Sequence, residues 1–131
     1  MLFFVRLIPP ALLRWLVRWR FKTVRQQAPT CVARSRKSEP VLLLDVRTLN
    51  EFDSGHVAGA IHATNVESAL RLIRDFQLDN PNVHVVVYCT VGYRSAKFVE
   101  CLTSRGCADV KNLEGGIWAW IATGQPTINV K

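Results

Sequence analysis

Apolar runs of strand length alternate with segments of helical spacing through most of this chain. Residues 41–46 and 83–88 are nearly continuous apolar runs, which are typical of strands buried on both faces of a sheet. Residues 67–76 and 95–105 carry apolar side chains at helical spacing, and residues 110–113 form a further strand-like run. Strands that alternate with helices predict an α/β fold: a mostly parallel central sheet flanked by helices on both faces.

Shorter elements are predicted between these segments. Thr48 and Glu51 have the spacing of a capping box, which favours a short helical turn. The others are an edge strand over residues 21–25, a helix over 29–38, a strand over 60–62 and a last helix over 117–123. Gly115-Gly116 opens the last helix, and we expect these glycines to permit a close approach of that helix to the sheet.

The beginning of the chain differs in pattern from the rest. Pro9-Pro10 follows an apolar start, and the residues after it have the spacing of an amphipathic helix. We therefore predict a basic amphipathic N-terminal segment over residues 1–21 and one domain over residues 22–131.

This N-terminal segment fits a membrane surface better than a spanning helix or a secretory signal. Its arginines interrupt every window of about 20 apolar residues, and no small-residue cleavage site follows. The segment would contact an anionic membrane peripherally through residues 1–20, and Trp15 and Trp19 would then lie at headgroup depth. Packing on the domain or on a second subunit is the alternative. The sequence leaves this choice and the oligomeric state open.

The composition indicates one globular domain whose net positive charge comes from the N-terminal residues. The chain has 131 residues, of which 49% are hydrophobic, enough for one domain with a core. Nine of the 17 basic residues and no acid lie in residues 1–38, so the remainder, with eight basic and ten acidic residues, is nearly neutral. A nearly neutral domain argues against nucleic acid as a partner.

The four cysteines form no CxxC pair and have no metal-ligand spacing with the three histidines, so no metal site is predicted. A chain with this much core needs no disulfide, which favours a reducing compartment and a cytoplasmic location. Cys31, Cys101 and Cys107 are interpreted as small apolar residues. A role for Cys101 or Cys107 as a resolving thiol for Cys89 stays open.

Cys89 differs from the other cysteines because it lies where a predicted buried strand ends and a helix begins. Such a turn aims backbone N–H groups and the positive end of the helix dipole at one spot. Gly92 lets the chain bend tightly there, and Ser95 is placed to cap the helix. With Arg94 nearby, these features predict a thiol pKa below the usual value of about 8.5. We expect Cys89 to act as a nucleophile and Arg94 to bind an anionic substrate.

Polar residues near the predicted strand ends have two interpretations each. Asp45 and Arg47 either support the cysteine loop from the neighbouring strand or form a structural ion pair. His56 is interpreted as a hydrogen-bonded turn residue rather than a catalytic base. Tyr93 either helps to select the substrate or is simply exposed.

Four motifs, in this order, resemble the rhodanese-like (sulfurtransferase) domain family over about residues 41–126. They are Asp-Val-Arg at residues 45–47, the stretch from Glu51 through Gly55-His56 to Ile61, the CxxGxRS-type loop at residues 89–95, and Leu-Glu-Gly-Gly with a tryptophan at residues 113–120. The resemblance implies a single rhodanese-like domain and no cofactor or metal.

For function, the resemblance implies a sulfurtransferase. Cys89 would take a sulfane sulfur from a small anionic donor such as thiosulfate, form a persulfide, and pass the sulfur to cyanide or a thiol. The expected site residues are Cys89 as nucleophile, Thr90, Val91, Gly92, Tyr93, Arg94 and Ser95 as the substrate-binding loop, and Asp45 and Arg47 in support. The physiological donor and acceptor stay open.

Two other functions are compatible with parts of this pattern. Cysteine phosphatases and arsenate reductases can share the implied fold but place five residues between the cysteine and the arginine. Here four residues separate Cys89 from Arg94, so the loop is too tight for phosphate. The second alternative is a non-enzymatic rhodanese-like binding or regulatory module, or a protein sulfur relay. The presence of both Cys89 and Arg94 favours activity.

Overall fold

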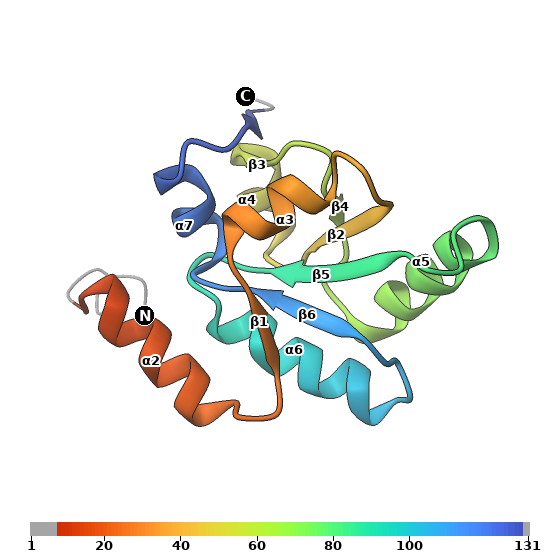
Figure 1. Cartoon of the computed structure of the whole chain (residues 1–131), viewed down its shortest axis with the longest axis horizontal. Coiled ribbons are helices and arrows are strands. Elements are labelled where there is room, and N and C mark those ends of the chain that lie inside the picture. The colour runs from red at the N-terminus through yellow and green to blue at the C-terminus, as the bar shows by residue number, and fades with distance from the viewer. Residues whose placement is uncertain (1–7, 130–131) are drawn as a thin grey trace.

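The central sheet has five strands, all paired in parallel, in the order β1–β6–β5–β2–β4 (Figure 1). The structure is a computed structural model that describes residues 8–129. The sheet consists of β1 (Arg25–Gln27), β2 (Val41–Asp45), β4 (Ile61–His62), β5 (His84–Tyr88) and β6 (Val110–Leu113). A separate antiparallel pair joins β3 (His56–Val57) to β7 (Thr127–Ile128). Because the five sheet strands run in one direction, their carboxyl ends meet at one edge of the sheet.

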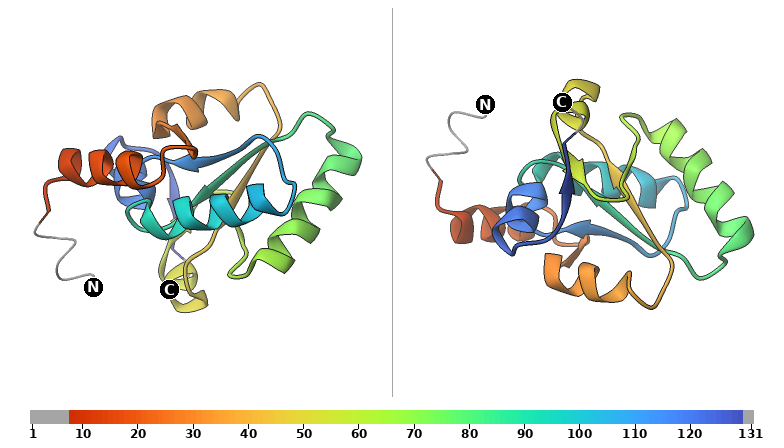
Figure 2. Two further views of the ribbon diagram at one scale, coloured as in Figure 1. Left: turned by 90° about the horizontal axis from the view of Figure 1, so that it is seen from below. Right: turned by 90° about the horizontal axis from the view of Figure 1, so that it is seen from above.

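Helices cover both faces of the sheet (Figure 2). The helices α5 (Val66–Asp79) and α6 (Tyr93–Ser104) pack on one face, and α3 (Pro29–Ser35) and α7 (Gly116–Ala122) pack on the other. A short helix, α4 (Leu49–Ser54), follows β2 at the carboxyl edge. The predicted α/β fold, with a parallel sheet between two helix layers, is confirmed.

Alternate residues of the central strands face opposite helix layers. Leu44 and Val87 belong to the apolar cluster under α5 and α6, whereas Leu43 and Val86 belong to the cluster under α3 and α7. All four side chains are at most 2% exposed. Burial on both faces explains why each strand appears in the sequence as an uninterrupted apolar run.

The helix α2 (Pro10–Arg20) lies against the domain at its C-terminal end. Val17 and Phe21 are 3% and 1% exposed and belong to the same apolar cluster as α5 and α6. Residues 1–7 of the predicted N-terminal segment lie outside the described residues. Within residues 8–129, no helix has the length and apolar character needed to cross a bilayer.

Differences from the sequence-based prediction concern the short elements. The first strand begins at Arg25 rather than at Phe21, because Phe21 is buried at the end of α2. The helix α6 begins before Ser95, since Gly92 is its N-cap residue. The β3–β7 pair is absent from the prediction because strands of two residues show no readable alternation.

Candidate active site

The sulfur of Cys89 is enclosed at the carboxyl end of β5, where the chain turns into α6. Cys89 is 1% exposed. The Gly92 N–H donates to its Sγ over 3.1 Å, and the N–H and Oγ–H of Ser95 donate over 3.4 and 3.3 Å. Three donors that converge on one sulfur stabilise a negative charge on it, whereas a structural thiol needs no such arrangement.

Ser95 does not cap α6, so that part of the prediction is wrong. Gly92 occupies the N-cap position with φ +103°, and the Ser95 hydroxyl turns inward to Cys89. The first N–H groups of a helix have no partner within that helix, so the start of α6 presents donors at the mouth of the loop. The loop therefore combines a fixed sulfur with backbone groups that favour an anion.

Asn112, on β6, holds the bend of the cysteine loop. It is completely buried, and its Nδ2 donates to the carbonyl oxygen of Gly92 and to Oε1 of Gln26, both over 3.0 Å. A Cβ added at Gly92 would lie 3.4 Å from the backbone nitrogen of Gly115, which leaves little room for a larger residue. Sequence reasoning missed Asn112. The signal was a polar residue within a predicted strand of a buried sheet.

The start of α7 packs directly on the backbone of the cysteine loop. The Ile117 N–H donates to the Cys89 carbonyl over 2.9 Å, and the Trp118 N–H donates to the Thr90 carbonyl over 3.2 Å. Gly116 has φ +63°, and a Cβ there would overlap the Thr90 carbonyl group. Gly116 therefore permits a close approach of α7, but to the backbone of the cysteine loop rather than to the sheet, whereas a Cβ at Gly115 would meet Ala119 of α7 itself.

Arg94 is held by a carboxylate at the rim of the loop. Its Nη1 and Nη2 donate to the two oxygens of Glu51 over 3.1 and 3.2 Å, and Nη2 also donates to Oγ1 of Thr90 over 2.9 Å. Burial opposes ionisation of Glu51, but the hydrogen bonds from Arg94 and Thr48 outweigh it and lower the pKa of Glu51 to about 2. The capping box of Thr48 and Glu51 is present.

The sequence places Glu51 in the capping box and in the second family motif, but neither pattern predicts its contact with Arg94. The hydrogen bond to Glu51 raises the pKa of Arg94, and the charge of Cys89 acts in the same direction. Arg94 therefore stays cationic beside the sulfur, with a side chain that is 42% exposed. It can meet an anion that arrives from solvent.

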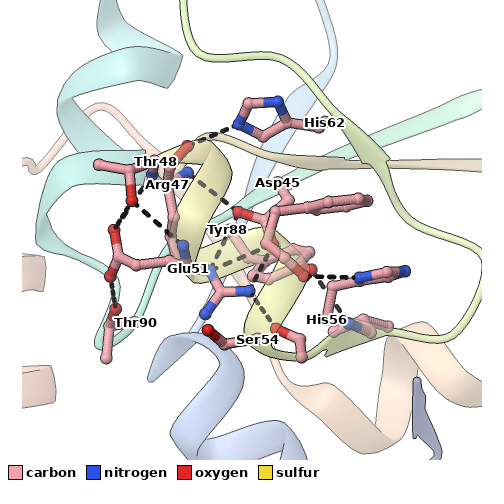
Figure 3. A network of polar contacts seen from close by, with 12 residues as sticks. Asp45, Arg47, Thr48, Glu51, Ser54, His56, His62, Tyr88 and Thr90 are labelled. Atoms are coloured by element: carbon pink, nitrogen blue, oxygen red, sulfur yellow. Dashed lines mark hydrogen bonds and ion pairs between the residues drawn. The ribbon is translucent and has the colours of Figure 1, made fainter. Parts of the chain in front are cut away.

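Asp45 and Arg47 form a buried ion pair behind the loop (Figure 3). Arg47 Nη2 donates to Asp45 Oδ2 over 2.7 Å and to the Gly55 carbonyl over 2.6 Å. Beside the pair, the Tyr88 hydroxyl accepts the Val57 N–H over 3.1 Å. Burial, with the charge of Asp45, raises the pKa of Tyr88 well above its usual value. The pair thus ties β2 to the turn before β3. Arg47 also lines the open groove that it shares with Glu51 and Thr90 of the cysteine loop.

His56 and Tyr93 each pack against an aromatic ring. The His56 Nδ1 donates to the Phe52 carbonyl over 2.9 Å, and the two rings stack at 3.8 Å. The Tyr93 ring packs edge-on against Phe21 at 5.0 Å and is 38% exposed. His56 is thus a hydrogen-bonded turn residue, and the end of α2 covers one side of Tyr93.

Two cavities flank the cysteine loop. One, of about 240 Å³, lies between α2, α7 and Val91, with Trp118 on its wall. The other is an open groove of about 550 Å³ beside Glu51, Thr90 and Trp118. A third cavity, of about 620 Å³, lies near residues 81–85 at the opposite end of the sheet and contacts no loop residue. Space for a small molecule therefore exists on both sides of the loop.

The remaining cysteines lie away from Cys89. Cys101 is exposed in the second half of α6, and Cys107 follows the end of that helix, whereas Cys89 precedes its beginning. A helix rises about 1.5 Å per residue, so Cys101 lies too far along it for a disulfide with Cys89 without rearrangement. Among residues 8–129, no group of three or more His, Cys, Asp or Glu side chains is arranged to hold a metal ion.

Comparison with known proteins places this geometry in a family. The family model described as "Rhodanese-like domain" matches residues 28–123. The chain is 35% identical over 88 residues to a protein named thiosulfate sulfurtransferase GlpE of Pseudomonas putida, covering 67% of this chain and 76% of the relative. It is 40% identical over 81 residues to the tRNA uridine(34) hydroxylase of Streptococcus thermophilus. That match covers 60% of this chain but only 25% of the hydroxylase.

Known structures agree with the family match. A rhodanese-like domain protein from Staphylococcus aureus superposes with a TM-score of 0.60 at 31% identity, covering 74% of this chain and 91% of that one. A thiosulfate sulfurtransferase from Pseudomonas aeruginosa superposes with a TM-score of 0.75 at 22% identity, which shows the fold alone; it covers 93% of this chain and 23% of that one. With a family model that matches most of its length, the chain belongs to the rhodanese-like domain family.

Proposed function

We propose that this protein is a sulfurtransferase that carries sulfane sulfur on Cys89. The observation that carries the proposal is the set of three hydrogen-bond donors on the Cys89 sulfur, two from Ser95 and one from Gly92. A thiolate is the form of cysteine that attacks sulfur, and these donors favour it. The relatives named thiosulfate sulfurtransferase support the same chemistry.

The proposed reaction has two displacement steps, with thiosulfate as the donor in vitro. The Cys89 thiolate attacks the outer sulfur of thiosulfate, a new S–S bond forms, and sulfite leaves with the electron pair of the broken S–S bond. Cyanide or a thiolate then attacks the outer sulfur of the persulfide, and the Cys89 thiolate leaves. No oxidant or reductant is consumed, and ping-pong kinetics are expected.

We propose that the residues around Cys89 stabilise the negative charges of the reaction and bind the anionic donor. The backbone and hydroxyl donors of Gly92 and Ser95 stabilise the sulfur that attacks and later leaves. Arg94 attracts the anionic donor while Glu51 and Thr90 fix the direction of its guanidinium group. The backbone N–H groups at the start of α6 receive the charge of the outer sulfur in the persulfide.

A thiosulfate:cyanide assay combined with intact mass spectrometry tests this proposal. We expect the wild type to form thiocyanate and to gain about 32 Da, one sulfur, after incubation with thiosulfate alone, as a covalent intermediate requires. Cys89→Ala should abolish both signals, whereas the matched variant Cys101→Ala should retain both. If the wild type shows neither turnover nor adduct, the binding or regulatory module becomes the better description of the protein.

A further inference from the structure

The helix α2 has an inward face that belongs to the domain. Val17 of the helix and Phe21, the residue directly after it, are buried in the core. Leu13 lines the small cavity beside the cysteine loop. Arg18 forms an ion pair with Glu114, the residue before the two glycines that open α7. The helix lies outside residues 28–123, which match the family model. These contacts fix which side of α2 faces outward.

The outward face of α2 is apolar. Leu12, Trp15 and Trp19 are 47%, 57% and 58% exposed. Positions three, four and seven apart share one side of a helix, so the three side chains form a single stripe. The two indole rings stack with centroids 6.3 Å apart and an angle of 13° between their planes. Large apolar side chains gathered on one exposed stripe mark a surface that contacts something else.

The charged residues of α2 itself are all basic. Arg14, Arg18 and Arg20 lie on the same helix, and Lys22 follows it. Residues 1–38 contain no acid. The side chain of Arg18 is 58% exposed despite its ion pair. Apart from Glu114, which pairs with Arg18, the charged side chains described beside the stripe are cations. An apolar stripe with a cationic border matches a surface that is apolar within and anionic at its boundary.

We propose that the outward face of α2, defined by Leu12, Trp15 and Trp19, binds in the plane of an anionic membrane surface. The tryptophan rings lie at headgroup depth, which is where indole is most favourable in a bilayer. Arg20 and Lys22 contact the lipid phosphates. The proposal does not depend on sulfur transfer, since none of these side chains contacts the cysteine loop in the arrangement described above.

A second copy of the chain fits this face less well than a membrane. With 11 residues, α2 is about 16 Å long, and a stripe about 10 Å wide gives roughly 160 Å². Stable protein interfaces bury about 800 Å² on each partner. Two copies would also bring like charges together. A bilayer needs no complementary shape, and it supplies the opposite charge.

Vesicle co-sedimentation of the full chain tests the proposal. We expect the wild type to bind vesicles that contain phosphatidylglycerol, to bind pure phosphatidylcholine vesicles much more weakly, and to be released as salt is raised. The double variant Trp15→Ala/Trp19→Ala should lose about tenfold or more in partitioning. The matched variant Leu49→Ala/Leu78→Ala also removes two exposed apolar side chains, but outside α2, and should bind like the wild type.

Two outcomes would overturn the proposal. One is an equal partitioning of the wild type and the Trp15→Ala/Trp19→Ala variant. The other is a concentration-dependent dimer, seen by sedimentation velocity, that this variant abolishes, because the stripe would then join two copies. Far-ultraviolet circular dichroism checks that the variants are folded. Thiosulfate:cyanide turnover, measured on the same samples without vesicles, should be unchanged. Membrane binding and sulfur transfer are thus measured independently, and either proposal can fail without the other.

Discussion

Two residues, Gly92 and Ser95, supply the three described hydrogen bonds to the sulfur of Cys89. The position of Cys89 could be predicted because a thiol at the end of a buried strand and the start of a helix is unusual for a core residue. The inward turn of Ser95 could not. Serine is also a favoured N-cap residue, and the sequence pattern does not fix the first residue of a helix to within one or two positions.

Ser95→Ala should slow sulfur transfer without unfolding the protein. The variant keeps both backbone donors but removes the hydroxyl that donates to the sulfur over 3.3 Å. A hydrogen bond to a charged group contributes about 1.5–3 kcal/mol, so kcat/KM for thiosulfate should fall by about 10- to 100-fold.

Ser104→Ala is the matched control for that measurement. Its hydroxyl donates to the Cys101 carbonyl at the other end of α6, and it is exposed. We expect it to retain wild-type kinetics. An unchanged kcat/KM in Ser95→Ala would show that the hydroxyl has no part in stabilising the thiolate.

At the scale of elements, the cysteine loop is fixed by segments that follow it in the chain. Asn112 on β6 holds the Gly92 carbonyl, and α7 donates two backbone hydrogen bonds to the loop. Sequence patterns predicted β6 and α7 as elements. They could not predict these contacts, because apolar spacing says which elements exist but not which polar atoms meet across them.

Gly116→Ala should destabilise the protein more than an ordinary glycine substitution. The residue has φ +63°, and its new Cβ would overlap the Thr90 carbonyl group. A left-handed conformation costs an L-residue about 1–2 kcal/mol, and the overlap adds about 1–3 kcal/mol. We expect a loss of at least about 2–3 kcal/mol in the free energy of unfolding, measured with urea.

Gly124→Ala separates these two contributions. Gly124 follows the C-terminus of α7 with φ +78°, but nothing lies within 4 Å of a Cβ built there. The substitution should therefore cost only the conformational part, about 1–2 kcal/mol. Equal losses in the two variants would mean that the loop backbone moves away from α7 at no cost.

At the scale of the whole molecule, the sheet direction and its helix layers followed from the alternation of long apolar runs. The order β1–β6–β5–β2–β4 did not, because side-chain periodicity carries no information about which parallel strands are neighbours. Ion pairs between segments that are distant in the chain also could not be predicted from the sequence pattern. Glu51 and Arg94 are 43 positions apart in the chain, and their pairing joins α4 to the start of α6.

The Glu51–Arg94 pair should make stability depend on pH. The pKa of Glu51 is about 2 in the folded protein against 4.5 as its ordinary value. The carboxylate therefore stabilises the folded state fully above pH 4.5, and this contribution is lost as the pH falls through 2. Because the carboxyl group is 27% exposed, we expect about 1 kcal/mol.

Urea unfolding of the wild type and Glu51→Gln over a pH series measures this contribution. The difference in unfolding free energy should be full at about pH 6 and should narrow steadily toward about pH 2. Glu100→Gln, on α6 and outside this pair, should show no such narrowing. A Glu51→Gln difference that is constant with pH would contradict the assigned pairing.

The dependence of the cysteine loop on β6 and α7 also sets an order of events during synthesis. A ribosome releases a chain from its N-terminus, so Cys89 emerges before the residues that bind its loop. The Asn112 hydrogen bond cannot form until residue 112 is free, and the backbone bonds from Ile117 and Trp118 cannot all form until residue 118 is free. A nascent or truncated chain that ends before residue 118 therefore carries the thiol without its ordered surroundings, and the proposed loading of sulfur requires the chain up to that residue.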